Sequence, residues 1–116
     1  MINSYRELTV WQKSMELVEL IYKIVVLFPK YEEHCLSKQI RRCVVSIPSN
    51  IAEGYGRNYT ADYKRFLCIA RGSLYELQTQ MQIATRLKYI NNTHIALSED
   101  LVMEIEKMLN TLIKKL

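Results

Sequence analysis

The stretch of sequence that decides the fold is residues 61–88, which read ADYKRFLCIARGSLYELQTQMQIATRLK. Apolar side chains recur in it at steps of three and four, which places them on one face of an α-helix. This face consists of Tyr63, Phe66, Ala70, Leu74, Leu77, Met81, Ala84 and Leu87. Thr60 is a suitable N-cap and Asp62 suits the first turn, so we predict a helix over Ala61–Lys88. Gly72 costs this helix about 1 kcal/mol relative to alanine, and we expect a neighbouring backbone to approach it closely.

Three further segments show helical periodicity on either side of this one. The first helix is predicted over Thr9–Phe28, because Pro29 pushes the residue before it out of helical geometry. The second is predicted from about Glu32 to Tyr55, since its apolar register continues through Pro48. The fourth should begin between Thr93 and Ser98, either of which can cap it. Short connections between long helices predict antiparallel neighbours.

The composition agrees with a small helical protein. The chain has 116 residues with only 3 Gly and 2 Pro, which favours a few long helices in one domain. We therefore predict a single all-α domain over residues 1–116, an antiparallel up-down-up-down four-helix bundle. The first helix is apolar over an unusually wide arc, so we expect it to be covered on two sides. Its apolar residues are Trp11, Met15, Leu17, Val18, Ile21, Tyr22, Ile24, Val25 and Phe28.

The positive charge is concentrated in the middle third of the chain. The whole chain carries +4, whereas residues 38–71 hold seven basic and two acidic side chains and so carry +5. The basic residues are Lys38, Arg41, Arg42, Arg57, Lys64, Arg65 and Arg71. On the outer sides of the second and third helices they either contact the phosphates of a nucleic acid or form an ordinary solvated surface. Tyrosines alternate with arginine around Arg57, and tyrosine rings can stack on unpaired bases.

Polar side chains follow one flank of the core face on both of these helices. The second helix carries Gln39, Ser46, Asn50 and Glu53, and the third carries Ser73, Glu76 and Gln80. Such stripes commonly meet as a structural hydrogen-bond network that fixes the register of two helices. The alternative is acid–base chemistry by Glu53 and Glu76, which would require both carboxylates to line an open pocket.

Other motifs for chemistry are missing from the sequence. We predict no catalytic residues, no metal site and no cofactor, because the chain has no Glu-x-x-His pair, no phosphate-binding glycine loop and no spaced Cys/His cluster. Its three cysteines follow no disulfide pattern, and its longest apolar run is too short to span a bilayer. The expected protein is therefore not an enzyme, and the expected location is the cytoplasm, away from membranes.

Three blocks of the sequence resemble one known family. They are residues 8–13 (LTVWQK), residues 39–42 (QIRR) with 46–54 (SIPSNIAEG), and residues 72–80 (GSLYELQTQ). These blocks resemble the four-helix-bundle proteins encoded by intervening sequences in bacterial 23S ribosomal RNA genes, also labelled S23 ribosomal proteins. The resemblance implies a homopentamer. It also implies a relationship to the accessory variability determinant proteins of diversity-generating retroelements. Those proteins are basic, bind nucleic acid and associate with a reverse transcriptase.

Two functions from different classes follow from these features. The first is a non-enzymatic oligomeric protein that binds RNA or DNA through the basic face of the second and third helices. The alternative is a protein–protein interaction scaffold without direct nucleic-acid contact, in which the wide apolar face of the first helix closes an oligomer and the basic face recruits an acidic protein.

Overall fold

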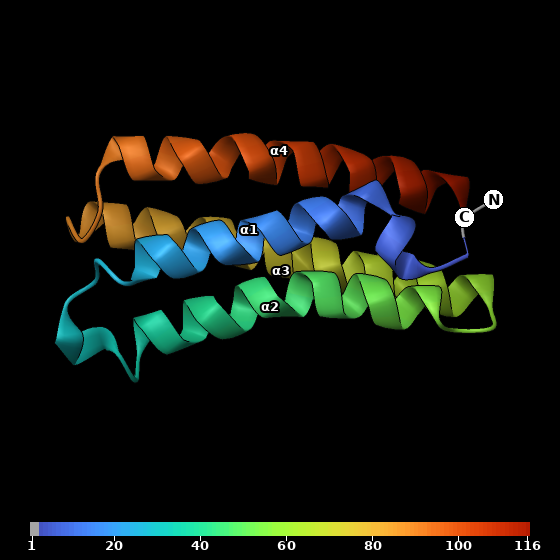
Figure 1. The fold of residues 1–116 in the computed structure, drawn as a ribbon, viewed down its shortest axis with the longest axis horizontal. Coiled ribbons are helices and arrows are strands. Elements are labelled where there is room, and N and C mark those ends of the chain that lie inside the picture. The colour runs from blue at the N-terminus through green and yellow to red at the C-terminus, as the bar shows by residue number, and fades with distance from the viewer. Residues whose placement is uncertain (1–2) are drawn as a thin grey trace.

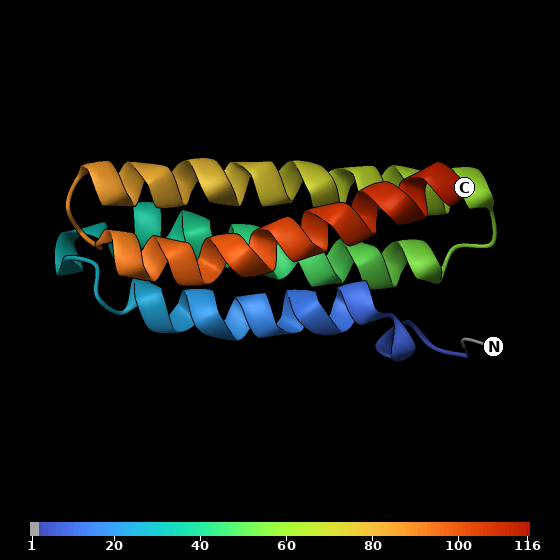
Figure 2. The same ribbon diagram turned by 90° about the horizontal axis from the view of Figure 1, so that it is seen from above.

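A computed structural model describes residues 3–116, which fold into four α-helices. They are α1 (Thr9–Val25), α2 (Leu36–Tyr55), α3 (Thr60–Arg86) and α4 (Asn92–Lys115), with the short 3-10 turns η1 (Tyr5–Glu7) and η2 (Lys30–Glu32) before α1 and α2. Consecutive helices run antiparallel in a bundle that measures 44 × 25 × 19 Å (Figures 1 and 2). Both α1 and α3 pack against α2 and α4, so α1 and α3 occupy one diagonal of the bundle. The predicted all-α antiparallel four-helix bundle is confirmed.

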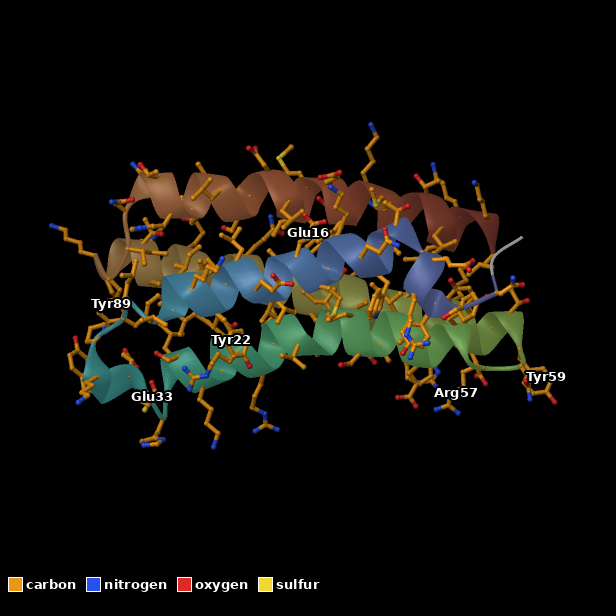
Figure 3. All side chains as sticks on the ribbon, in the orientation of Figure 1. Glu16, Tyr22, Glu33, Arg57, Tyr59 and Tyr89 are labelled. Atoms are coloured by element: carbon orange, nitrogen blue, oxygen red, sulfur yellow. The ribbon has the colours of Figure 1, made fainter. Side chains whose placement is uncertain are left out.

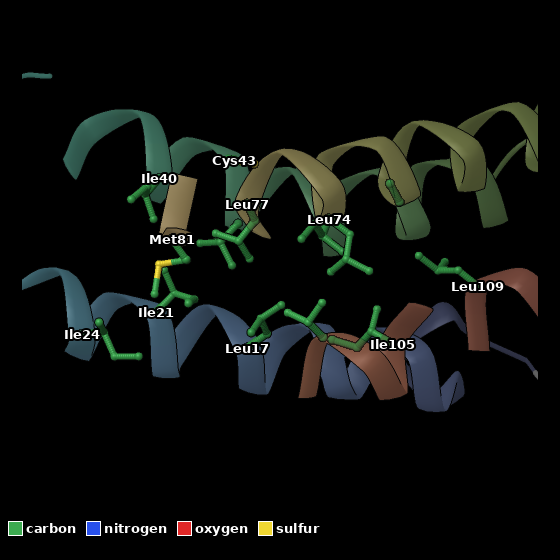
Figure 4. Packing of buried hydrophobic residues seen from close by; sticks show 14 of the residues in the cluster. Leu17, Ile21, Ile24, Ile40, Cys43, Leu74, Leu77, Met81, Ile105 and Leu109 are labelled. Atoms are coloured by element: carbon green, nitrogen blue, oxygen red, sulfur yellow. The ribbon is translucent and has the colours of Figure 1, made fainter. Parts of the chain in front are cut away.

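The core runs along the whole axis of the bundle and receives side chains from every helix. Figure 4 shows this packing around Leu17 of α1, Ile40 of α2, Leu77 of α3 and Ile105 of α4, all of which are fully buried. Burial of one such side chain stabilises the fold by roughly 1.5–3 kcal/mol. All but one of the positions predicted on the inner face of the third helix are buried or half-buried, and the exception is Leu87, which is exposed at the end of α3.

The predicted start of the second helix is wrong. The helix begins at Leu36 rather than near Glu32, because Lys30–Glu32 form the separate turn η2. The Glu32 side chain then caps α2 from outside, since its Oε1 accepts a hydrogen bond of 3.2 Å from the Leu36 backbone N–H. From Leu36 the helix continues without a break through Pro48 to Tyr55, as predicted.

The other helix ends differ from the predictions by a few residues. The first helix ends at Val25 instead of Phe28, although Phe28 stays buried. The third helix begins with Thr60 as its first residue, so Thr60 is not the N-cap. The fourth begins at Asn92, before the predicted range. Its cap is Asn91, whose side chain accepts from the backbone N–H groups of Thr93 and His94, while the His94 ring accepts from the Asn91 N–H. These bonds satisfy donors that the first turn of a helix leaves unpaired.

The helices α2 and α3 form the most extensive pair in the bundle, and they approach closely at Gly54. A Cβ atom placed on Gly54 would lie 2.7 Å from Phe66 Cβ and 3.3 Å from the Tyr63 carbonyl oxygen. By contrast, a Cβ on Gly72 would meet no atom of a neighbouring element within 4 Å in the described part of the chain. The predicted close approach at Gly72 is therefore wrong, and Gly54 is the glycine that the packing requires.

Alanine substitution at these two glycines should have opposite effects. Gly54→Ala should lower the free energy of unfolding by about 1–3 kcal/mol, because the added methyl group overpacks the contact with α3. Gly72→Ala should raise it by about 0.5–1 kcal/mol, because alanine favours the helix and the space is open. Unfolding in guanidinium chloride, followed by circular dichroism, measures both effects. A neutral result at Gly54 would contradict the close approach.

Candidate functional site

Six of the seven predicted basic residues lie in two groups at different heights of the bundle, and Arg71 lies apart from both. Lys38, Arg41 and Arg42 occupy the first turns of α2. The other four lie in the α2–α3 loop and the first half of α3; they are Arg57, Lys64, Arg65 and Arg71. A helix rises 1.5 Å per residue, so Arg42 and Arg57 are separated by about 22 Å along α2. Figure 3 shows Arg57 at one end of the bundle and Glu33, which precedes α2, at the other. The basic residues therefore form two clusters, with Arg71 separate near the middle of α3, rather than one compact patch.

Three of the seven basic side chains have partners within the protein. The Arg41 guanidinium contacts the Glu33 carboxylate at 2.9 Å, and Arg57 contacts Glu53 at the same distance. Arg71 donates to the Asn110 Oδ1 at 2.8 Å, a neutral partner that leaves its charge uncompensated. This contact also shows that Arg71 faces α4.

The remaining four basic side chains have no anionic partner in the described chain. Within residues 3–116, no carboxylate lies within 4.0 Å of the charged groups of Lys38, Arg42, Lys64 or Arg65. Together with Arg71, these residues keep five uncompensated positive charges on the surface of α2 and α3. A surface of this kind attracts polyanions.

Two arginines of the cluster at the α2–α3 loop, Arg57 and Arg65, pack against the aromatic ring of Phe66. The guanidinium carbons of Arg57 and Arg65 lie 4.8 and 4.6 Å from the centroid of the Phe66 ring, within cation–π distance. Tyr59 in the same loop is 72% exposed. Sequence analysis assigned Phe66 to the core face and missed its cation–π contacts with Arg57 and Arg65. Periodicity indicates that a residue is buried, but it does not show which side chains contact its ring.

Six of the seven predicted polar residues line a common groove between α2 and α3, which we call the polar groove. They are Gln39, Ser46, Asn50, Ser73, Glu76 and Gln80; Arg42, Cys43 and Ile69 complete the lining, and the groove has a volume of about 430 Å³. Glu53 is the exception, since it is exposed and pairs with Arg57. The two carboxylates considered for acid–base chemistry are therefore not brought together in the groove.

The hydrogen bonds within the polar groove are mostly local. The Ser46 hydroxyl donates to the Cys43 carbonyl at 2.6 Å, and the Asn50 amide donates to the Ser46 carbonyl at 2.7 Å, both within α2. The bond that crosses to α3 comes from the Cys43 thiol, which lies 3.1 Å from the Ser73 carbonyl oxygen. That a wider network fixes the register of the helices stays a prediction.

Cys43 has a stronger polar role than its sequence context indicates. Burial, together with the hydrogen bond to the Glu76 carboxylate and the negative charge of that group, raises the pKa of its thiol from 9.0 to about 12. The thiol consequently stays protonated at neutral pH and can donate to the Ser73 carbonyl. Sequence analysis did not identify this role, because nothing in the one-dimensional pattern places Glu76 beside Cys43.

One polar atom of the groove lacks a partner. Gln80 is only 7% exposed, and its buried Oε1 accepts no hydrogen bond from any group of residues 3–116. A buried acceptor left unsatisfied costs about 1–3 kcal/mol. The Gln80 amide oxygen is thus a buried, unsatisfied acceptor behind the wall of the groove.

A second surface, on the outer side of α1 and α2, is apolar. Trp11, Met15 and Val18 of α1 and Val45, Pro48 and Ala52 of α2 line a shallow depression of about 370 Å³, which we call the apolar surface. Met15 and Val45 are each 39% exposed. The other face of α1 is buried in the core through Leu17 and Ile21. The apolar arc of α1 is therefore wider than the part that packs inside the bundle, as the sequence predicted.

No cluster of three or more His, Cys, Asp or Glu side chains in residues 3–116 could hold a metal ion. None of the helices in this range is both long and apolar enough to cross a membrane.

Comparisons with known proteins identify relatives of the chain. The family described as 23S rRNA-intervening sequence protein matches residues 6–111. A crystal structure of a protein of unknown function from the S23 ribosomal protein family of Bacteroides thetaiotaomicron is similar, with a TM-score of 0.82 and 31% sequence identity. The similarity covers 91% of this chain and 99% of that one. No curated protein matches the chain.

The protonation of Cys43 can be tested by alkylation. In the variant Cys35→Ser/Cys68→Ala, where Cys43 is the only thiol, iodoacetamide should react slowly up to about pH 11, because the raised pKa of Cys43 keeps the thiolate fraction small. The variant Cys43→Ala/Cys68→Ala, which keeps the exposed Cys35, should react much faster at pH 9. Since the folded-state pKa lies above the unfolded value, the stability associated with this thiol is present below pH 9 and lost between about pH 9 and 12. Equal alkylation rates at pH 9 would contradict this account.

Proposed function

Because the chain belongs to the 23S rRNA-intervening sequence protein family, we propose that it is a non-enzymatic, oligomeric protein that binds RNA or DNA. The similar S23-family protein is itself of unknown function, so the proposal rests on the surfaces of this chain. The observation that carries it is the set of five uncompensated cationic side chains on α2 and α3 in the described structure, in a segment with a local charge of +5.

The two basic clusters fit a long anionic ligand better than a compact one. The clusters at the start of α2 and at the α2–α3 loop are about 22 Å apart along the helix, a distance that spans several nucleotides of an extended strand. Exposed Tyr59, beside Arg57, adds an aromatic ring on which a base can stack. A nucleic-acid strand supplies both the phosphates and the bases that such a surface can contact.

The apolar surface on α1 and α2 supports assembly with further copies of the chain. A contiguous apolar patch on a soluble protein commonly marks an interface. Family resemblance suggests five copies in the assembly. Placing α1 against another protomer would cover Met15 and Val45 while leaving the basic residues of α3 accessible, because α3 lies diagonally opposite α1.

A protein-interaction scaffold is the second candidate function, and the apolar surface favours it as well. In that case the partner is a different protein, such as an acidic protein or, by family analogy, a reverse transcriptase. Affinity capture with and without nuclease separates the two functions, since partners bound through nucleic acid are lost after digestion and partners bound directly to the protein remain.

Nucleic-acid binding through the basic residues should depend steeply on salt. Titration of a fluorescent single-stranded RNA at 50–300 mM KCl should give a log–log slope of about −3 or steeper, as expected when four or more phosphates are neutralised. Arg42→Glu and Arg71→Glu should each weaken binding about tenfold. The matched control, Lys23→Glu on the exposed side of α1, changes the net charge equally and should have a much smaller effect. A flat salt response, or equal losses in all three variants, would contradict the proposal.

Assembly through the apolar surface should be broken by a charge placed within it. Light scattering should give a mass several times 13.7 kDa for the unaltered chain and a smaller mass for Met15→Lys and Val45→Lys. Met103→Lys is the control, because Met103 is 62% exposed on α4, away from the apolar surface. Unchanged helicity by circular dichroism would show that the variants fold. A mass that is insensitive to Met15→Lys and Val45→Lys would exclude this surface as the interface.

A further inference from the structure

The antiparallel register of α2 and α3 places opposite charges on the two walls of the polar groove. The contact between the Cys43 thiol and the Ser73 carbonyl aligns the middle of α2 with the middle of α3. In this register Arg42 of α2 and Glu76 of α3 line the same stretch of the groove. They form no ion pair within 4.0 Å, and Arg42 has no other carboxylate partner in residues 3–116. A cationic donor and an anionic acceptor therefore face the same space without neutralising each other directly.

The acceptor side of the groove also contains the unsatisfied oxygen of Gln80. Gln80 lies one helical turn beyond Glu76 on α3, so its Oε1 and the Glu76 carboxylate lie on the same flank of the helix. Cys43 does not compete as an anion, because its thiol remains protonated. The groove thus offers the Glu76 carboxylate as an acceptor on α3 and the Arg42 guanidinium as a donor on α2.

We propose that the polar groove binds one unpaired guanine base of the nucleic-acid strand, an assignment that rests on the proposed function and deepens it. Guanine carries two adjacent donors, N1–H and N2–H₂, which match the two oxygens of the Glu76 carboxylate. It also carries two adjacent acceptors, O6 and N7, which an arginine guanidinium such as that of Arg42 reads in its characteristic bidentate contact.

The other bases fit this arrangement less well. Adenine and cytosine present one exocyclic amino group beside a ring acceptor, which would face the carboxylate with a repulsive lone pair. Uracil and thymine present one N–H between two carbonyl groups. Only guanine combines paired donors with paired acceptors, so it alone satisfies Glu76 and Arg42 together.

The groove can accept a base only from an unpaired segment. A base within a duplex has its Watson–Crick edge covered, whereas a base in a single strand or loop can be turned out and read on that edge. Lys38 lies one turn before Arg42 on the same side of α2 and is exposed, which places a cation next to the groove for the phosphate of the bound nucleotide.

Mononucleotides test the base preference independently of strand binding. In titrations of the full chain followed by two-dimensional NMR, GMP should shift resonances of the polar groove and saturate. IMP, which lacks the 2-amino group, and 7-deaza-GMP, which lacks N7, should bind roughly tenfold more weakly, because each loses one hydrogen bond of a bidentate pair. AMP, CMP and UMP should bind more weakly still. Equal shifts by all the nucleotides would overturn the assignment and indicate a phosphate contact only.

Variants locate the base within the groove. Glu76→Gln and Arg42→Gln should each lower GMP affinity at least tenfold, because each removes one of the two bidentate contacts. Gln80→Met should raise the melting temperature without nucleotide, since it removes an unsatisfied buried oxygen. Gln78→Met on α3 and Glu106→Gln on α4 are controls where these two helices meet, since Gln78 contacts Glu99 and Glu106 contacts Tyr75. Unchanged GMP affinity in both groove variants would overturn the proposal.

A strand experiment separates this inference from the proposed function. Two single-stranded RNAs of equal length, one with a single guanine in a uracil background and one with uracil alone, should differ in affinity by about tenfold or more. Salt-dependent binding without this difference would overturn the guanine site and leave nucleic-acid binding intact. Binding of GMP without binding of either strand would instead overturn the proposed function.

Discussion

The close packing of α2 on α3 is the constraint on which the rest of the structure depends. Because Gly54 has no side chain, the backbone of α2 can approach Phe66 of α3 more closely than a residue with a Cβ atom would allow. That contact at one end, together with the Cys43–Ser73 contact nearer the middle, sets the antiparallel register of the pair. The register then decides which polar side chains share the groove and which apolar side chains remain for α1 and α4.

This packing also separates two surfaces of different chemistry. The apolar surface lies on α1 and the outer side of α2, whereas the polar groove lies between α2 and α3. Arg42 belongs to the groove, and Arg57 and Arg65 are held against Phe66 at the loop. An oligomer that closes through α1 can therefore keep cationic and polar side chains on α3 accessible to a strand. Helix α2 thus contributes to both the apolar surface and the polar groove.

Periodicity predicted the fold well because burial of an apolar face repeats along a helix, as at Leu74, Leu77 and Met81. It placed the close approach at Gly72 instead of Gly54, since that contact depends on which turns of two distant segments meet. It also could not show that Glu53 pairs with Arg57 while Glu76 faces the groove, because both carboxylates fall on similar flanks of their helices. The helix ends shifted where individual side chains, such as those of Glu32 and Asn91, act as caps.

The central claim is that the bundle assembles through one surface and binds nucleic acid through another. Size-exclusion chromatography with light scattering, run at low salt with and without an unstructured RNA, tests it most directly. The account predicts a mass several times 13.7 kDa for the protein alone, and a further increase that matches bound RNA without loss of protein subunits. A monomer whose mass is unchanged by RNA would contradict it.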